Sequence, residues 1–341
     1  MQLSGRFKHA VKTALAITMA YGFALWFDWS KPMWAAFAVA LISLPTLEAS
    51  LGKGGQRLWG TLLASGMALT LIALFPQDRW LFLTAIASWL AFCTYQMSGG
   101  RNAYLWFCAG FVCSIIAANG GPNPTEAFTV AVIRTLETAL GIICFAVVFS
   151  LLWPVRADVS ATPAEPPPAP DTVERLNRAA RVFLVYCSGF LLVIFVPGFP
   201  GSYSFLGMLA PLAIIITNTP QMPPQLLVKP VALSMLFASP VYMFVMPMLD
   251  SFYQLGPVIF LACFVIAYSL HTPQAALGRT LGLAFFAVVT GIENQQSYSF
   301  LSLANTALMF FSVLLLIYLG SGIQIFAAGK NDMVAANAET D

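Results

Sequence analysis

Two opposite charges, Arg134 and Glu137, stand inside one long apolar stretch of the chain, residues 125–154. With Thr125 as the N-cap and a rise of about 1.5 Å per residue, Arg134 lies about 13 Å and Glu137 about 18 Å along a helix. Both then fall near the middle of a bilayer core about 30 Å thick. Charges at that depth usually face a bundle interior or a water-filled path. A spacing of three residues puts both side chains on one helix face, where they can pair.

The chemistry that these two groups can perform is the binding of an anion and the uptake of a proton. An arginine in a low-dielectric site can hold a carboxylate through two parallel hydrogen bonds, and Glu137 competes for the same Arg134 guanidinium. A buried carboxylate can also be protonated. Protonation of Glu137 would release Arg134 to a substrate anion, and deprotonation would reset the pair. We therefore predict that the pair lines a substrate pathway.

Two further groups of charges would sit at the ends of such a pathway. Glu48, Lys53 and Arg57 follow an apolar stretch and are interleaved with glycines, which predicts a charged entrance for anions on the cytoplasmic side. Glu293 stands near the other end of a later stretch and is predicted to shape a periplasmic exit. Tyr104 could stack on an aromatic substrate, whereas Trp34 fits the aromatic belt of a membrane interface.

The composition excludes most soluble classes of protein. Hydrophobic residues make up 59% of the 341 residues and charged residues 9%, whereas a soluble domain has about 25% charged residues. The chain is therefore predicted to be an all-α polytopic membrane protein in contact with the lipid bilayer. Six cysteines lie in apolar stretches without a C-x-x-C pair, which indicates neither a metal site nor disulfides. No enzyme motif, ATP site or nucleic-acid-binding pattern is present, so we expect a protein that is not an enzyme and has no cofactor.

Twelve apolar stretches divide into two sets of six. They fall at about 13–28, 32–48, 58–75, 79–96, 103–119, 127–153, 178–196, 203–218, 230–248, 256–270, 276–293 and 301–323. Two six-helix repeats in the same orientation are predicted, over residues 1–156 and 175–325. A proline-rich cytoplasmic linker (157–174) joins them, and a cytoplasmic tail (326–341) follows.

The distribution of basic residues predicts the orientation. Of the 16 lysines and arginines, only Lys31 and Arg79 fall outside when the N-terminus is cytoplasmic, and Arg134 lies within a span. The positive-inside rule then places both termini in the cytoplasm. Arg175, Arg178 and Arg181 form one helix stripe near the linker, and this stripe is predicted to anchor at the lipid headgroups.

A short motif between the second and third stretches resembles a known family. Its residues are Pro45, Ser50, Lys53, Gly54, Arg57, Gly60, Thr61 and Ala64. Together with Arg134, Glu137 and Gly141, this order resembles the fusaric acid resistance family of bacterial inner-membrane proteins, which includes p-hydroxybenzoic acid efflux pumps. The resemblance covers residues 8–154 well and residues 176–323 more loosely.

The resemblance implies an inner-membrane exporter of small aromatic or organic acids. It also implies a periplasmic membrane-fusion adaptor and an outer-membrane channel as partners, and it leaves a homo-oligomer open. Without an ATP site, uphill export must draw on an ion gradient or on a partner protein. Two alternatives remain at this stage: a passive organic-anion channel, and an envelope scaffold in which Arg134 and Glu137 only fasten two helices together.

Overall fold

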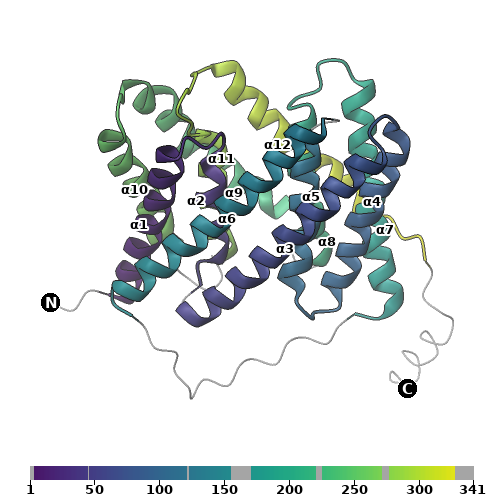
Figure 1. The fold of residues 1–341 in the computed structure, drawn as a ribbon, viewed down its shortest axis with the longest axis horizontal. Helices are drawn as coiled ribbons and strands as arrows, with labels where there is room; N and C mark the ends of the chain where they lie inside the picture. Colours follow the sequence, from purple (N-terminus) through teal and green to yellow (C-terminus); the bar gives the residue numbers. More distant parts are fainter. Residues whose placement is uncertain are drawn as a thin grey trace.

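A computed structural model describes residues 4–44, 46–120, 123–154, 170–219, 225–270 and 276–326. Within these ranges the chain forms twelve α-helices and no strand (Figure 1). The helices are α1 (Gly5–Trp26), α2 (Met33–Ile42), α3 (Leu47–Leu74), α4 (Arg79–Ser98), α5 (Ala103–Gly120), α6 (Pro124–Leu151), α7 (Thr172–Phe195), α8 (Tyr203–Asn218), α9 (Gln225–Pro240), α10 (Phe252–Ser269), α11 (Ala276–Thr290) and α12 (Phe300–Gly320).

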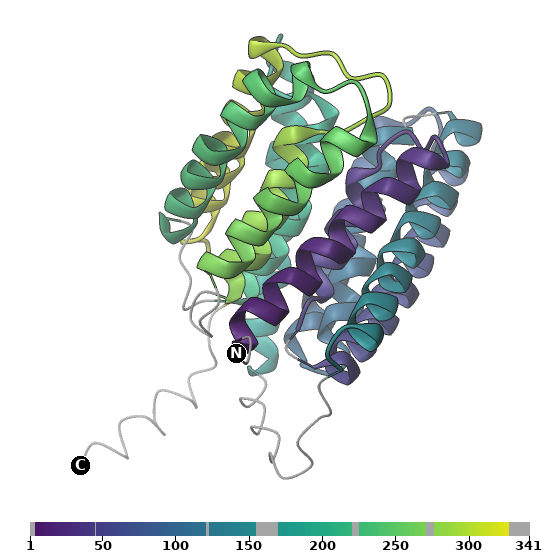
Figure 2. The same ribbon diagram turned by 90° about the vertical axis from the view of Figure 1, so that its left-hand side faces the viewer.

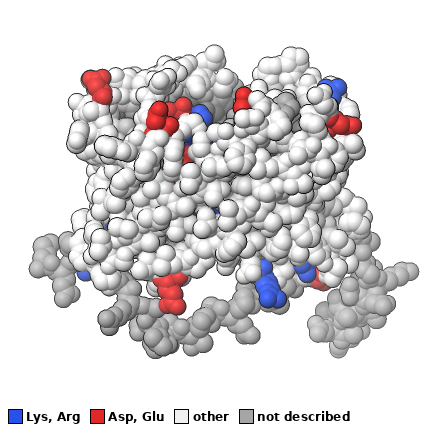
Figure 3. Space-filling model, in the orientation of Figure 1, with Lys and Arg blue, Asp and Glu red and all other residues white. Residues whose placement is uncertain are grey.

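Eight of these helical segments are long and apolar enough to cross a membrane: α3, α4, α5, α6, α7, the segment Leu227–Met248 that includes α9, α10 and α12. The helices α2 and α8 and the segment Gly278–Thr290 are apolar but shorter. Figure 3 shows the coloured charged side chains gathered mainly at the two ends of the bundle, with a broad white band between them. The prediction of an all-helical, multi-pass membrane protein is confirmed.

The junction between α2 and α3 differs most from the predicted boundaries. The helix α2 ends at Ile42 and α3 begins at Leu47, eleven residues before the apolar stretch predicted at 58. Thr46 caps α3 by accepting a hydrogen bond from the Ala49 amide, and the Ser50 hydroxyl donates to the Thr46 carbonyl. Hydropathy misses this first part of α3 because it contains charged residues. Of these, Lys53 and Arg57 contact aromatic rings of the bundle, whereas Glu48 is exposed.

Helix α6, which carries the central charges, begins with an N-cap two residues earlier than the sequence predicts. The cap is Asn123, whose side chain accepts a hydrogen bond from the Thr125 amide, and Pro124 occupies the first helical position, where its missing N–H costs nothing. A helix of 28 residues is about 42 Å long, more than a bilayer core. Accordingly α6 and α3 cross the bundle obliquely in Figure 1, because tilt accommodates the excess length.

The helices pack in pairs that join distant parts of the sequence. Helix α1 packs along α10, and α4 packs along α7. Helix α3 contacts α5 and α6, whereas α9 contacts α11 and α12. Figure 2 shows most of the purple-to-teal helices on one side of the molecule and the green-to-yellow helices on the other. We call the end of the bundle at which α1 and α7 begin the N-terminal face, and the other end the opposite face.

Candidate functional site

The central feature of the bundle is a buried ion pair between Arg134 and Glu137 on α6. Nη1 of Arg134 lies 3.0 Å from Oε2 of Glu137. Arg134 is 7% exposed and Glu137 is fully buried. The two groups are close but poorly aligned, and Nε and Nη1 of Arg134 and both Glu137 oxygens have no hydrogen-bond partner among the described residues. The predicted pairing is thus present, and it leaves hydrogen-bonding capacity unused inside the protein.

Close contact between α6 and α2 sets the surroundings of this ion pair. A Cβ on Gly141 would lie 2.5 Å from the Ala35 carbonyl oxygen and 2.7 Å from the Ala38 Cβ, so only glycine allows this approach. Nearer the start of α6, the same approach brings Arg134 to the first turn of α2. There the Arg134 guanidinium lies 4.8 Å from the centre of the Trp34 ring. A cation at this distance over a desolvated indole is stabilised by about 2 kcal/mol.

From Trp34 a row of rings and cations continues along α2 toward α3. Phe37 lies one turn further along α2 and meets Trp34 edge to face, with ring centroids 5.3 Å apart. The Arg57 guanidinium lies 5.7 Å from the Phe37 ring and 5.7 Å from the Phe111 ring. Arg57 is only 2% exposed. A second buried arginine therefore contacts aromatic rings in the same half of the bundle.

The row ends toward the N-terminal face at Tyr104 and Lys53. Nη1 of Arg57 donates a hydrogen bond of 3.3 Å to the Tyr104 hydroxyl, and the Lys53 ammonium lies 4.6 Å from the centre of the Tyr104 ring. Lys53 is half-buried, and Glu48, in the first turn of α3, is accessible at its start. We call this alternating arrangement the cation–aromatic column, defined by Lys53, Tyr104, Arg57, Phe37, Trp34 and Arg134.

The column joins residues that the sequence predicted at two separate places in the pathway. Lys53 and Arg57, predicted at an entrance, share one continuous arrangement with Arg134, predicted at depth. Sequence reasoning missed Trp34 and Phe37 as site residues. Their spacing of three residues in an otherwise aliphatic helix is the signal that could have revealed them, since it puts both rings on one face.

Most of the remaining motif residues support the helices that carry the column. Ser50 is buried and bonds to the turn before α3. A Cβ on Gly60 would lie 2.6 Å from both the Cys108 Cβ and the Leu105 carbonyl oxygen, so glycine there lets α3 approach α5. Thr61 is buried, and its hydroxyl has no hydrogen-bond partner in the described residues. Pro45 lies outside the described residues.

Glu293, predicted at the exit, forms an ion pair across the opposite face. Its Oε1 pairs with Nζ of Lys31, which belongs to the α1–α2 loop. The neighbouring Asn294 donates hydrogen bonds to the Asp28 carboxylate and to the Leu25 carbonyl oxygen. The loop before α2 is thus tied to the loop before α12.

A cavity of about 300 Å³ opens elsewhere, between α4, α5, α7 and α8 near the opposite face. Phe75, Phe82 and Phe190 contribute its walls, and Arg79 and Tyr203 lie at its outer part. No residue of the cation–aromatic column lines it. This cavity is therefore a feature separate from the column.

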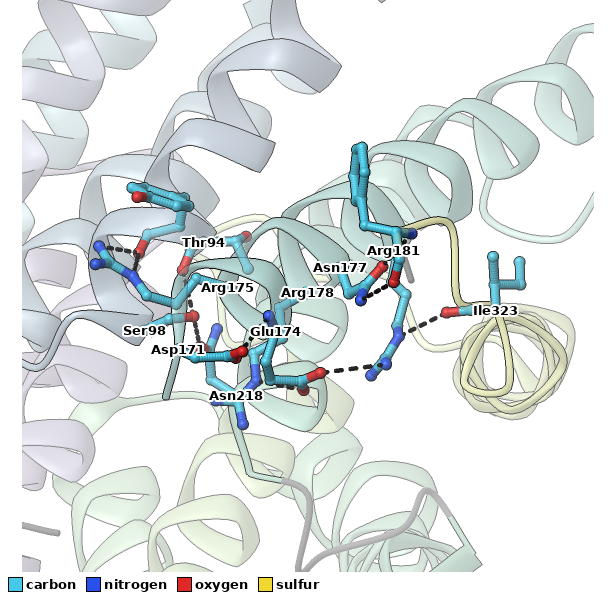
Figure 4. Close-up of polar contacts among 12 residues, drawn as sticks. Thr94, Ser98, Asp171, Glu174, Arg175, Asn177, Arg178, Arg181, Asn218 and Ile323 are labelled. Atoms are coloured by element: carbon cyan, nitrogen blue, oxygen red, sulfur yellow. Dashed lines mark hydrogen bonds and ion pairs between the residues drawn. The ribbon is translucent and has the colours of Figure 1, made fainter. Parts of the chain in front are cut away.

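At the N-terminal face, the arginine stripe of α7 binds protein groups (Figure 4). Arg175 donates to the Tyr95 carbonyl oxygen and lies 4.0 Å from the Tyr95 ring. Arg181 donates to the Ile323 carbonyl oxygen, and Arg178 pairs with Glu174. The sequence predicts that this stripe anchors at lipid headgroups. The described contacts instead fasten the start of α7 to α4 and to the segment after α12.

Fold and site together define the class of protein: a helical, multi-pass membrane protein that keeps two arginines and a carboxylate inside its helix bundle. Residues 6–165 match the sequence model of the Fusaric acid resistance protein family. The resemblance noted from the α2–α3 motif and from Arg134 and Glu137 is thereby confirmed. No solved structure matches the chain.

Curated relatives each match less than half of the chain. "Uncharacterized transporter YdhK" of Salmonella typhimurium is 30% identical over 46% of this chain and 24% of that protein. "Uncharacterized transporter GOX0755" of Gluconobacter oxydans is 27% identical over 40% of this chain and 19% of that protein. "p-hydroxybenzoic acid efflux pump subunit AaeB" of Edwardsiella tarda is 29% identical over 44% of this chain and 25% of that protein. The matched region spans about a quarter or less of the length of these relatives.

Proposed function

We propose that this protein exports small aromatic or organic acids across the bacterial inner membrane, driven by a proton gradient. The observation that carries the proposal is the cation–aromatic column, which runs from half-buried Lys53 to buried Arg134. Its cations suit a carboxylate, and its rings suit a flat apolar body. The names of the AaeB and YdhK relatives, an efflux pump subunit and a transporter, support the same function.

The column offers a mechanism in which the substrate anion and the Glu137 carboxylate compete for one guanidinium. A carboxylate entering past Glu48 meets Lys53 first and then Arg57. At Arg134 it finds a guanidinium whose Nε and Nη1 make no hydrogen bond, with Nη1 in an ion pair to Glu137. Protonation of Glu137 removes the competing charge, so Arg134 holds the substrate. Deprotonation restores the ion pair and expels the anion toward an exit at Glu293, where Lys31 can attract it.

The packing pairs support two six-helix repeats. Adding six to the numbers of α1–α6 and subtracting six from those of α7–α12 converts the α4–α7 pair into the α10–α1 pair, and α3–α5 into α9–α11. The polar contacts follow the same rule. Arg6 of α1 lies 3.8 Å from the Tyr268 ring and donates to its carbonyl oxygen, as Arg175 of α7 does to Tyr95. We propose that residues 1–156 and 175–325 are repeats in the same orientation. Most of the linker, and the tail from 327 onward, lie outside the described residues.

The same proposal places both termini in the cytoplasm, following the positive-inside rule. Export from there out of the cell also requires a route through the periplasm and the outer membrane. A periplasmic membrane-fusion adaptor and an outer-membrane channel are the partners we propose, with a homo-oligomer as the assembly that would contact them.

Transport into proteoliposomes tests the proposal against its two alternatives. The purified full chain is reconstituted, and the accumulation of radiolabelled hydroxybenzoate is followed with and without an imposed proton gradient. An exporter accumulates the acid against its concentration gradient only when the proton gradient is present. A passive anion channel dissipates a substrate gradient and builds none. A scaffold gives no protein-dependent flux, which would reject the transport proposal.

A further inference from the structure

We infer that the cavity between α4 and α7 is a second binding site, which takes one small amphipathic monoanion with a ring as its apolar end. The inference rests on the cavity's own walls and does not depend on transport through the cation–aromatic column. The cavity's volume of about 300 Å³ lies at the lower end of the range for small-molecule pockets. It can enclose one or two fused rings, but not a whole phospholipid.

The inner end of the cavity is largely apolar, and its one hydroxyl proton, on Tyr186, is already used. Tyr186 lines it, and its hydroxyl lies 2.9 Å from the Ser114 hydroxyl. The Ser114 hydroxyl in turn donates to the Leu206 carbonyl oxygen at 3.1 Å, so the Tyr186 proton goes to Ser114. Both hydroxyl protons are therefore used within the protein. An apolar group fits against this floor, because a polar group would lose its water without gaining a partner.

Aromatic side chains form much of the wall between this floor and the mouth. Phe75 and Phe82 come from the ends of α3 and α4 that meet at the opposite face, and Phe190 comes from α7. Flat rings pack well between such walls, in offset or edge-to-face arrangements. The walls therefore favour a ring over a flexible chain as the apolar end of the ligand.

Among the described residues that line the cavity, Arg79 is the one cation, and it lies at the mouth. It is the first residue of α4 and is exposed, and within the described part of the chain it has no hydrogen-bond or ion-pair partner. Its guanidinium lies 5.2 Å from the Trp80 ring, which limits where it can point. The adjacent Asp78 carboxylate is engaged with the Trp80 and Leu81 amides. One unpaired guanidinium above an apolar floor matches one carboxylate on an otherwise apolar molecule.

Under the proposed repeat relationship, the first residues of α4 and α10 occupy matching positions in the two halves. Phe252 is the first residue of α10, as Arg79 is of α4. On α10 that side chain turns onto α1, where a Cβ on Gly22 would lie 2.9 Å from the Phe252 ring. A ring covers the α1–α10 position, while a cation and a cavity occupy the α4–α7 position. The difference lies in the side chains, because the helix pairs are the same.

Cysteine protection tests this site in the full-length protein. Ala118 lines the cavity and is half-buried. In an Ala118→Cys variant in proteoliposomes, a membrane-impermeant maleimide should label the new thiol, and 2-naphthoate should slow labelling about ten-fold. Arg79→Gln in that background should abolish protection by 2-naphthoate. Arg101→Gln, which removes an exposed charge just beyond the other end of α4, should leave it intact.

Other readouts separate this inference from the transport proposal and from lipid binding. Neutral 2-naphthol should protect the thiol equally with and without Arg79. Protection by 2-naphthoate should survive Arg134→Gln, whereas transport should not. Protection that disappears with Arg134→Gln, or that persists in Arg79→Gln, would overturn the inference. So would labelling that responds to the phosphatidylglycerol content of the vesicles and not to 2-naphthoate.

Discussion

The guanidinium of Arg134 lies 4.8 Å from the centre of the Trp34 ring, which joins the cation of α6 to the aromatic face of α2. Arg134 is held there by two partners, a ring and a poorly aligned Glu137 carboxylate. A guanidinium held in this way can exchange one of those partners for a ligand. Two carboxylates competing for it, one of the protein and one of a substrate, provide the simplest coupling of a proton to an anion.

Neutralising one or both members of the ion pair should change the stability of the protein and its binding of hydroxybenzoate in different ways. Arg134→Gln leaves Glu137 buried without its counter-ion, which costs about 3–5 kcal/mol for a buried pair and should lower the melting temperature in detergent. The double variant Arg134→Gln/Glu137→Gln should recover most of that loss, because no charge remains unpaired. Hydroxybenzoate binding, measured by titration calorimetry, should be lost in both variants. Recovery of binding in the double variant would show that Arg134 does not hold the substrate.

Glu137→Gln alone should uncouple transport from the proton gradient. The amide mimics a protonated carboxyl group, so Arg134 stays available and the substrate binds, but no proton cycle resets the site. We expect counterflow of unlabelled against labelled hydroxybenzoate to continue, while accumulation driven by an imposed pH gradient falls at least ten-fold. Gradient-driven accumulation at the wild-type rate would contradict the coupling role.

Trp34 should determine the preference for aromatic over aliphatic acids. Trp34→Leu removes the ring that meets both Arg134 and Phe37, whereas Trp34→Phe keeps a ring there. Stacking on one aromatic side chain contributes about 0.5–1.5 kcal/mol, which corresponds to roughly two- to twelve-fold in KM. We expect Trp34→Leu to raise the KM for hydroxybenzoate by that factor and to leave the KM for an aliphatic acid of similar size unchanged. Trp34→Phe should behave nearly as the wild type, and equal losses for both acids would indicate a structural role.

Gly141 should be intolerant of even one added methyl group. A Cβ there would lie 2.5 Å from the Ala35 carbonyl oxygen, so Gly141→Ala forces α6 away from α2 and weakens the contact between Arg134 and Trp34. We expect a lower melting temperature and impaired transport. Gly66→Ala on α3 is the matched control, since a Cβ added to Gly66 would meet nothing within 4 Å. Alanine should stabilise that helix by up to about 1 kcal/mol. Equal melting temperatures for the two variants would contradict the packing explanation.

Much of the site's chemistry could be predicted from local sequence, and some of its contacts could not. The pairing of Arg134 with Glu137 is predictable because a spacing of three residues on one helix decides their proximity. Arg57 is predicted at an open entrance, yet it is 2% exposed, because the structure places it against Phe37 and Phe111 from two other helices. The partner of Glu293 could not be predicted either, since Lys31 lies 262 positions away in the chain.

The amino-acid sequence by itself determined the class of protein: low charge and long apolar stretches permit only helices buried in a bilayer, where every backbone group must be paired within its own segment. It also identified the charged residues within apolar stretches as candidate functional residues, because a charged side chain inside a bilayer costs free energy. Only the tertiary structure decided what surrounds them. The column from Lys53 to Arg134 and the cavity beside Arg79 depend on how separate helices pack, and helix packing depends on contacts between residues far apart in the chain.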